Sequence, residues 1–228
     1  IHNKSIINLV KTRFVDSHTK SKVFEYYNHN DYCLKKNNRK VIENKLTKII
    51  KNYDLVIVAD YGHGLIDLNL ANKISENSHF LSVNTQANAG NRGFNFISKY
   101  KKADHICLAE HELNLEIRSK DKVEENIIAL TKKIDCKRIT ITSGERGLTH
   151  FYNKKFFRIP AFTTDVVDRV GAGDAVLSLI SLALFKKNSI EIALLLSGLV
   201  GSLAVRIIGN KSSIGKKQLI ADIKTILK

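Results

Sequence analysis

Short apolar runs that end in polar side chains recur along the middle of the chain, with amphipathic segments between them. The clearest run covers residues 54–60, and others cover 80–83, 106–108 and 137–142. A continuous apolar run of this length is typical of a strand buried on both faces. Strands that alternate with helices predict an α/β fold, in which a mostly parallel sheet carries helices on both faces.

Polar residues stand where two of these strands should end. Asp60 closes the first run and enters a loop with the sequence Asp-Tyr-Gly-His-Gly, and Asn84 follows the second run. Open parallel sheets bind ligands at the carboxyl ends of their strands. Asp60 and Asn84 are therefore candidate substrate-binding residues.

Helical periodicity is visible at 39–52, 67–76 and 123–134, and two nearly continuous apolar segments lie at 175–185 and 192–205. The last segment is the best membrane candidate, but it is shorter than a membrane-spanning helix and contains glycine and serine. It is predicted to be a buried helix, so no membrane partner is expected. Two extended segments at 6–15 and 22–27 predict a hairpin, either a lid or part of another sheet.

The stretch at 168–176, Asp-Arg-Val-Gly-Ala-Gly-Asp-Ala-Val, leads into the first apolar helix. Gly171 and Gly173 allow a close backbone approach, and the free amides of a helix N-terminus favour a phosphate. A carboxylate beside a phosphate is unfavourable unless it has a task, and Asp174 could take the proton from an attacking hydroxyl. The simpler alternative is that Asp168 or Asp174 only caps the helix.

A second glycine motif, Thr-Ser-Gly-Glu-Arg-Gly at 142–147, follows the strand at 137–142. Alone it indicates a turn into a strand at 148–152. Together with the later Asp-Arg-Val-Gly-Ala-Gly-Asp-Ala, it resembles the ribokinase-like sugar kinases, also called the PfkB family. The likeness extends from about residue 54 to residue 215.

This resemblance implies a ribokinase-like fold, ATP as the phosphoryl donor and a site built from several motifs. Asp174 matches the general base, and the amides of Gly171, Ala172 and Gly173 match an anion hole. The nucleotide side is matched by Thr142, Gly144 and Gly147. Asp168 matches a carboxylate that helps to hold a monovalent cation in some relatives.

Magnesium is implied through Glu112, which matches the glutamate of the family's Asn-x-x-Glu motif. Ala109 stands where the family has asparagine. This departure predicts a change in how the metal is organised. It also keeps open a second hypothesis, a non-catalytic module that binds nucleotide or sugar with the kinase fold.

Within the family, Lys11-Thr12-Arg13 and the loop at 60–64 look most like kinases of heptose phosphates. That subgroup implies a small sugar or sugar phosphate as substrate, with Lys11, Arg13, Arg92 and Arg169 as candidate phosphate partners. Some heptose-phosphate kinases carry a fused nucleotidyltransferase domain, so the resemblance also implies such a domain outside this chain. A homodimer is a further expected partner arrangement.

The 228-residue length predicts a single kinase domain over 1–228, in which 1–30 forms a lid or a sheet extension. The chain begins at Ile1 and contains no methionine, so it is expected to be a fragment without the upstream sugar-binding motif. Three cysteines without metal-ligand spacing predict reduced thiols in a cytoplasmic protein and no structural zinc.

The formal charge is +15, from 37 Lys and Arg against 22 Asp and Glu. Such a charge permits nucleic-acid binding, which is a third hypothesis. The lysines, however, are spread along the chain and are not interleaved with aromatic residues. They are better explained as solvated surface charges, so nucleic acid is not an expected partner.

Overall fold

The computed structural model describes residues 9–16, 18, 22–28, 36–88 and 90–226. Its strands are β1 (Val10–Val15), β2 (Lys22–Asn28), β3 (Val56–Asp60), β4 (Leu81–Thr85), β5 (His105–Ala109), β6 (Arg138–Thr142), β7 (Leu148–Tyr152) and β8 (Lys155–Ile159). Its α-helices are α1 (Lys36–Ile50), α2 (Leu68–Asn77), α3 (Glu110–Ile117), α4 (Val123–Thr131), α5 (Ala172–Phe185), α6 (Ile190–Ala204) and α7 (Lys216–Ile226). Short 3-10 turns lie at η1 (Ile97–Lys99), η2 (Gly144–Arg146) and η3 (Ile208–Asn210).

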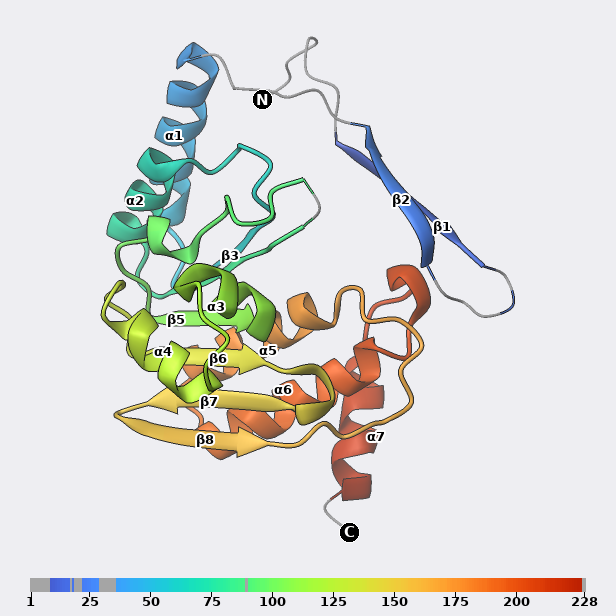
Figure 1. Ribbon diagram of the computed structural model, residues 1–228. Helices are drawn as coiled ribbons and strands as arrows, with labels where there is room; N and C mark the ends of the chain where they lie inside the picture. The colour runs from blue at the N-terminus through green and yellow to red at the C-terminus, as the bar shows by residue number, and fades with distance from the viewer. Residues whose placement is uncertain (1–8, 17, 19–21, 29–35, 89, 227–228) are drawn as a thin grey trace.

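Six strands form one sheet in the order β3-β4-β5-β6-β7-β8 (Figure 1). The pairs from β3 to β6 are parallel, and β6-β7 and β7-β8 are antiparallel. The carboxyl ends of β3, β4, β5 and β6 therefore share one edge of the sheet. Loops that follow these strands can converge there.

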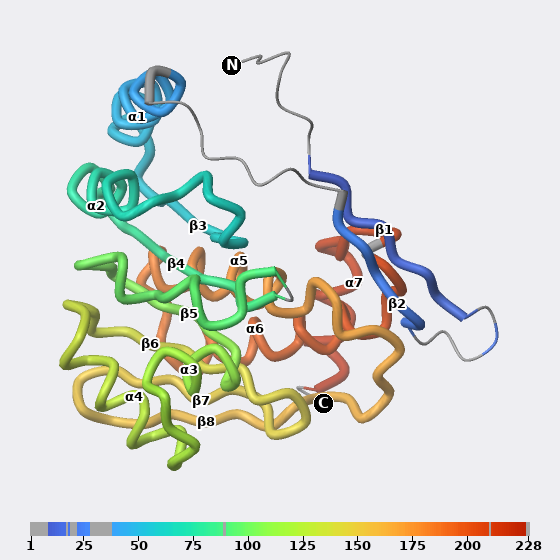
Figure 2. Tube along the Cα trace, turned by 45° about the horizontal axis from the view of Figure 1, so that its top comes forward, coloured from blue at the N-terminus to red at the C-terminus, as the bar shows by residue number. Residues whose placement is uncertain are grey.

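Two hydrophobic cores cover the two faces of this sheet. Along β5, Ile106 and Leu108 join the core beneath α1–α4, and Cys107 joins the core beneath α5 and α6. Figure 2 shows the two groups of helices on opposite sides of the sheet. Alternating side chains of a strand point to opposite faces, so a strand apolar at every position needs cover on both. β3 is an exception to the predicted burial on both faces, because it lies at the edge of the sheet and its Ile57 remains 39% exposed. The predicted α/β fold with helices on both faces is confirmed.

Local sequence accounts for several helix ends. Asp67 caps α2 by accepting from the Leu70 amide at 2.9 Å, and Ser189 caps α6 by accepting from the Ile192 amide at 3.3 Å. In α6, Ser197, Gly198 and their neighbours are buried against the sheet, which confirms the buried helix predicted at 192–205. Among the described residues, no helix is both long and apolar enough to cross a membrane.

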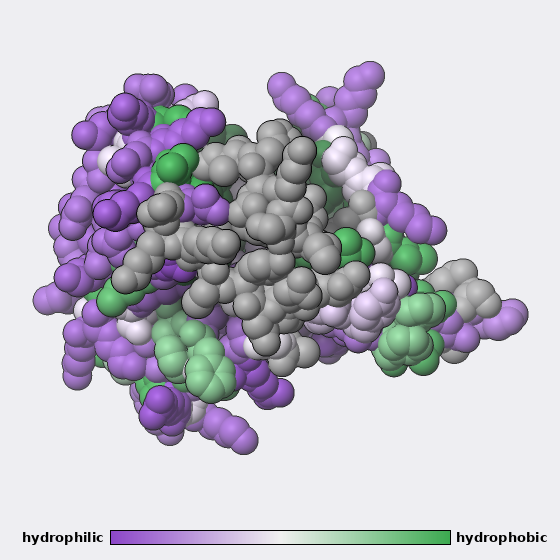
Figure 3. Space-filling model, turned by 90° about the horizontal axis from the view of Figure 1, so that it is seen from above, coloured by the Kyte–Doolittle hydropathy of each residue, from purple (hydrophilic) through white to green (hydrophobic). Residues whose placement is uncertain are grey.

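The β1-β2 hairpin forms a two-stranded sheet of its own, apart from the larger sheet (Figure 1). One face carries Lys11, Arg13 and Glu25, and the other carries Phe14 and Phe24, whose rings stack at 4.3 Å between centroids. The predicted hairpin is confirmed within the described residues, and the part of it at 6–8 lies outside them. Seen from above, the described surface is largely hydrophilic with separate hydrophobic patches (Figure 3).

Candidate active site

Two cavities meet at the carboxyl edge of the parallel strands. The first has a volume of about 990 Å³ and lies between the sheet edge, the β1-β2 hairpin and the start of α5. The second, about 590 Å³, lies between the β6-β7 turn and α6. Residues that line both cavities are Ala109, His111, Thr142, Arg169 and Gly173. A ligand in one cavity can therefore reach a ligand in the other beside the first turn of α5.

The start of α5 supplies the backbone at this junction. Gly171 has a φ of 83°, a left-handed conformation that glycine adopts without strain. The helix then begins at Ala172, and the Ala175 amide bonds to the Gly171 carbonyl at 3.0 Å. The first amides of a helix lack intrahelical acceptors, and the helix dipole makes this end attractive to anions. The predicted anion-binding position of Gly171, Ala172 and Gly173 thus lies at the junction.

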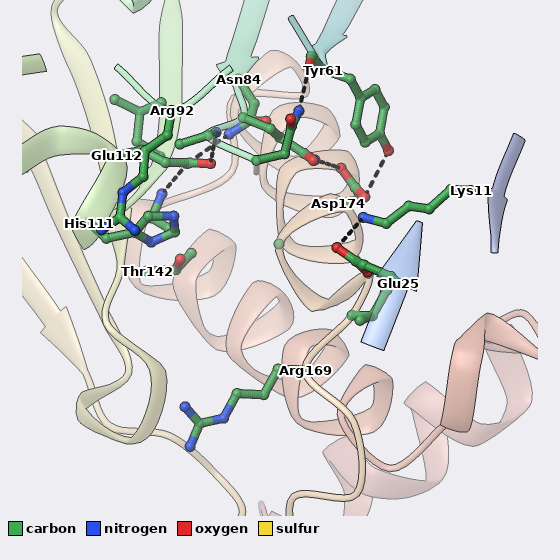
Figure 4. A pocket seen from close by; sticks show the side chains of 18 of the residues that line it. Lys11, Glu25, Tyr61, Asn84, Arg92, His111, Glu112, Thr142, Arg169 and Asp174 are labelled. Atoms are coloured by element: carbon green, nitrogen blue, oxygen red, sulfur yellow. Dashed lines mark hydrogen bonds and ion pairs between the residues drawn. The ribbon is translucent and has the colours of Figure 1, made fainter. Parts of the chain in front are cut away.

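Asp174, on the same turn, lines the larger cavity and is held by two donors. The Tyr61 hydroxyl donates to Oδ2 at 3.0 Å, and Gln86 Nε2 donates to Oδ1 at 2.8 Å (Figure 4). Burial raises the pKa of the Asp174 carboxyl, and the two hydrogen bonds oppose that shift. The group is a partly buried carboxylate with a raised pKa beside the first amides of α5, of which the Ala172 amide makes a long turn bond of 3.5 Å to the Arg169 carbonyl. This position suits a base that accepts a proton next to a phosphate.

Glu112 lies across the larger cavity at the start of α3. Its Oε2 accepts from the Ala109 amide at 2.8 Å and its Oε1 from the Ala87 amide at 3.1 Å. Burial raises the pKa of Glu112 against these hydrogen bonds. Glu112 therefore ties α3 to the loop after β4, and it faces the cavity where a cation could reach it through water.

Asn84, at 9% exposure, ends β4 beside Glu112. Its Nδ2 donates to the Cys107 carbonyl at 2.9 Å, and its buried Oδ1 has no partner among the described residues. Buried polar atoms are normally paired, so this oxygen on the cavity wall is available to a hydrogen-bond donor or to a cation. No group of three or more His, Cys, Asp or Glu side chains in the described part of the chain could hold a metal. Glu112 and Asn84 Oδ1 fit a hydrated magnesium ion better than a directly ligated one.

A basic cluster from the hairpin closes the larger cavity. Lys11, Arg13 and Lys22 share the single carboxylate of Glu25 at 3.2, 3.2 and 3.3 Å. Burial acts to raise the pKa of Glu25, but hydrogen bonds from these three cations hold it below its ordinary value. Three cations around one carboxylate leave two positive charges uncompensated within the cluster, which favours an anionic group in this cavity.

The smaller cavity contains the second glycine motif. Thr142 ends β6, and the turn 143–147 closes the β6-β7 hairpin through the bond from the Ser143 amide to the Gly147 carbonyl at 2.9 Å. Gly147 has a φ of 81°, and a Cβ there would meet the Ile159 carbonyl oxygen at 2.0 Å. Only glycine fits this turn, which sets Thr142 and Gly144 on the cavity wall.

For three of the candidate residues, the functional group of the side chain bonds to other parts of the protein. Asp60 is 3% exposed and lines neither cavity, because its carboxylate accepts from the Gly62 amide and the Tyr100 hydroxyl and pairs with Lys99. Asp168 accepts from the amides of Val170 and Gly209 at 3.0 and 2.8 Å and holds the loop before α5. Arg169 lines both cavities, and its exposed guanidinium bonds to Glu145.

Several cavity residues had no role in the sequence analysis. Tyr61 and Gln86 hold Asp174, and Lys22 and Glu25 complete the basic cluster. Gln86 carried a usable signal, because it follows a predicted strand two residues after Asn84. The contact between residues 86 and 174 could be found only once the strand order was known.

Residues 16–216 match the family model described as pfkB family carbohydrate kinase. Among curated proteins, the bifunctional protein HldE of Nitratiruptor sp. is 27% identical over 173 residues, which are 74% of this chain and 36% of that protein. The HldE of Histophilus somni is 28% identical over 172 residues, 74% of this chain and 35% of that protein. The chain thus spans about a third of the length of these relatives.

Solved structures show the same fold. Ribokinase from Thermotoga maritima superposes with a TM-score of 0.74 at 16% identity, covering 96% of this chain and 71% of that one. Phosphofructokinase-2 from Escherichia coli in complex with fructose-6-phosphate gives a TM-score of 0.72 at 12% identity, covering 96% and 70%. These overlaps confirm the ribokinase-like fold implied by the sequence.

Proposed function

Because the chain belongs to the pfkB family of carbohydrate kinases, we propose that it transfers the γ-phosphoryl group of ATP to a hydroxyl of a sugar phosphate, with Asp174 as general base. The observation that carries this proposal is the position of Asp174. It stands on the first turn of α5, where a cavity with a basic cluster meets the cavity of the glycine turn.

The residues at the junction divide the reaction between them. Asp174 accepts the proton of the attacking hydroxyl, so that the oxygen can bond to the γ-phosphorus while the β–γ bridging bond breaks. The amides of Gly171, Ala172 and Gly173 stabilise negative charge on the transferring group. Thr142, Gly144 and Gly147 contact the nucleotide from the smaller cavity.

Cations complete the proposed site. Magnesium, held through water by Glu112 with Asn84 Oδ1 beside it, would neutralise charge on the phosphates. Asp168 would support a monovalent cation near the loop that precedes α5. Asp60 would act on the substrate only by holding the loop 60–64, and Arg169 would contact phosphate from the junction.

The basic cluster supports a phosphorylated substrate. Lys11, Arg13 and Lys22 face the cavity from the hairpin, and Arg92 lines the same cavity from the loop after β4. A sugar phosphate would place its phosphate against the hairpin and its free hydroxyl near Asp174, with the hairpin acting as a lid. The HldE relatives and the likeness to heptose-phosphate kinases favour a heptose phosphate.

The complete protein is proposed to contain more than this kinase unit. The relatives are bifunctional by name and about three times as long as the segment they share with this chain. We infer that a nucleotidyltransferase activity accompanies the kinase. A homodimer in the cytoplasm is the proposed setting.

A coupled ATP-consumption assay with Mg²⁺ tests this function. The panel should contain heptose phosphates, hexose phosphates and the matching free sugars, assayed with the wild type, Asp174→Asn and Asp165→Asn. Asp165 is an exposed carboxylate that lines neither cavity, so its variant is the matched control. The proposal expects consumption that depends on one sugar phosphate, is lost in Asp174→Asn and persists in Asp165→Asn.

Ala109 favours the second candidate, a non-catalytic nucleotide or sugar-binding module. It lies at the junction without the amide that the family's asparagine would supply. ATP binding by calorimetry with no consumption on any sugar would support this module and overturn the kinase.

A further inference from the structure

We propose that Asn91 is a positioning residue that fixes Tyr61 and Gln86 and, through them, the carboxylate of Asp174. The proposal rests on the function proposed for Asp174. Asn91 is 6% exposed in the loop between β4 and η1. Its Nδ2 donates to the Tyr61 carbonyl at 2.7 Å and to the Gln86 carbonyl at 3.2 Å. One amide thus ties together the two residues whose side chains hold Asp174.

Two more asparagines of the same loop strengthen this arrangement. Asn88 Nδ2 donates to the Tyr61 carbonyl at 2.7 Å, and the Asn88 amide donates to Asn91 Oδ1 at 2.8 Å. Asn95 Nδ2 donates to the Asp60 carbonyl at 2.8 Å and to the Gln86 carbonyl at 3.2 Å. We call Asn88, Asn91 and Asn95 the asparagine clamp.

The chemistry of an amide suits the central position. Nδ2 carries two protons for two carbonyl acceptors, and Oδ1 accepts a backbone amide on the other side. A carboxylate would place oxygen against both carbonyls. Gly62 leaves the space for the clamp, because a Cβ there would meet Asn91 Nδ2 at 2.1 Å. The loop 60–64 is therefore built around Asn91.

The clamp acts on Asp174 because both of its carboxylate oxygens are held from clamped residues. The Tyr61 hydroxyl reaches Oδ2 and Gln86 Nε2 reaches Oδ1 (Figure 4). These donors stabilise the ionised carboxylate against burial, and a general base must be ionised to work. Losing the clamp would loosen both donors, so Asp174 would be less well oriented and harder to ionise.

The titratable or charged groups that line this cavity, besides Tyr61 and Asp174, are Lys11 and Arg13 on β1, Lys22, Glu25 and Tyr27 on β2, His63 in the loop 60–64, Arg92 after β4, Cys107 on β5, His111 and Glu112 on α3, and Arg169 before α5. Burial raises the pKa of the Cys107 thiol far above neutrality, so the thiol does not titrate with the base. The Asn91 side chain bonds to the carbonyls of Tyr61 and Gln86 and to the Asn88 amide. A change at Asn91 therefore reaches Asp174 through Tyr61 and Gln86.

The test uses two variants and a matched control in the full chain. Asn91→Asp replaces the donor by an acceptor that faces two carbonyls, and Asn91→Ser removes the amide without adding charge. The control is Asn126→Asp, because Asn126 is 2% exposed, donates from Nδ2 to Asn114 Oδ1 at 2.9 Å and lines neither cavity. Both substitutions remove a buried side-chain amide, but only Asn91 bonds to the residues that hold Asp174.

Activity is measured as kcat and KM across pH. Asn91→Ser is expected to lower kcat about 10- to 100-fold, with KM for ATP changed less than about 3-fold, because a small misplacement of a catalytic group has effects of this size. The acid limb of kcat is expected to move to higher pH. In the Tyr61→Phe/Gln86→Leu background, Asn91→Ser should cause no further shift. An unmoved acid limb, or a fully additive effect in that background, overturns the proposal.

A readout without turnover separates this inference from the function. The ¹³C resonance of the Asp174 carboxyl, assigned by its loss in Asp174→Asn, is titrated in the wild type, Asn91→Ser and Asn126→Asp. A midpoint that rises in Asn91→Ser alone supports the clamp, even for a protein that consumes no ATP. Equal midpoints in all three proteins overturn it. If Asn91→Asp does not fold, Asn91→Ser carries the test.

Discussion

Gln86 donates from Nε2 to Oδ1 of Asp174 at 2.8 Å across 88 positions of sequence. The contact joins the end of β4 to the first turn of α5. It exists because a parallel strand and the helix that covers it present their ligand-facing ends to the same edge of the sheet. The site therefore depends on how α5 is placed over the sheet as well as on the glycine motif.

Asp174→Asn should separate activity from stability. Burial raises the pKa of Asp174 in the folded protein above its ordinary value of 3.8. Between pH 3.8 and the raised pKa, the folded protein therefore binds more protons than the unfolded chain, so the free energy of unfolding falls as pH rises through this range. Asparagine removes the free-energy cost of an ionised carboxylate at this buried position at pH 7.5. Its side chain can still accept a hydrogen bond from Gln86 and donate one to Tyr61. We expect kcat to fall at least about 100-fold, while the urea midpoint stays equal or rises. A clear loss of stability at pH 7.5 would contradict the buried-carboxylate explanation.

Glu25→Gln should strengthen binding of the sugar phosphate. Glu25 forms ion pairs with three cations of the hairpin. A neutral glutamine removes the charge that competes with a phosphate for these cations. Lys11→Met should have the opposite effect and raise KM about 10-fold, which corresponds to about 1.4 kcal/mol. KM for ATP should not change in either variant. Lys155→Met, at an exposed position at the start of β8, is the control, and equal effects on free and phosphorylated sugars would contradict the assignment.

Much of the fold was predictable because β4, β5 and β6 are buried on both faces. The runs at 54–60, 80–83, 106–108 and 137–142 overlap β3, β4, β5 and β6, and the helices predicted at 39–52, 67–76 and 123–134 lie within a few residues of α1, α2 and α4. In each case a hydrophobic pattern alone carried the signal. The motif at 168–176 was recognisable because its glycines and carboxylate are contiguous in sequence.

The elements that were missed lack local signals. β8 follows β7 through Asn153 and Lys154, which have φ of 49° and 62° without a glycine to mark the turn. The helix α3 ends at Arg118, also with a positive φ. The asparagine clamp was invisible for another reason, since its partners Tyr61 and Gln86 lie on a different loop and a strand end.

Ala109→Asn should stabilise the protein and strengthen magnesium dependence. Ala109 stands at the N-cap of α3 and offers no side-chain acceptor, although Glu112 already bonds to its amide. Asparagine at an N-cap typically contributes about 0.5–2 kcal/mol. We expect a higher urea midpoint and a lower Mg²⁺ concentration for half-maximal activity. Ala109→Ser supplies the cap without the amide, so an equal magnesium response in both variants would show that only the helix had changed.

Gly147→Ala and Gly144→Ala should differ although they share one turn. Both glycines have positive φ, but a Cβ at Gly147 would meet the Ile159 carbonyl oxygen at 2.0 Å, and a Cβ at Gly144 would meet nothing within 4 Å. Gly144→Ala should cost only the left-handed backbone, about 1–2 kcal/mol. Gly147→Ala should cost more and weaken ATP binding, because the turn must move on the cavity wall. Equal unfolding midpoints and equal ATP affinities would count against this geometry.

The protein should lose stability in mild acid because of two buried histidines. A hydrogen-bonded line runs from Ser181 on α5 through Ser82, His105 and Thr140 to His150 on β7, with successive distances of 2.6, 2.7, 2.8 and 2.8 Å. Burial lowers the pKa of His105 well below 6.5 and that of His150 to about 4.

Below pH 6.5 the two histidines therefore bind protons in the unfolded chain but stay neutral in the folded protein. Their contribution to the free energy of unfolding is fully present above pH 6.5 and is lost as pH falls towards 4. Each histidine contributes a slope of up to about 1.4 kcal/mol per pH unit. Urea unfolding of wild type, His150→Phe and the exposed-site control His79→Gln at pH 7.5, 6 and 5 measures this slope. We expect a shallower slope in His150→Phe alone, because phenylalanine removes the group that titrates and the Nε2 that has no partner in the described structure. Equal slopes in wild type and His150→Phe would show that His150 is not the group that titrates.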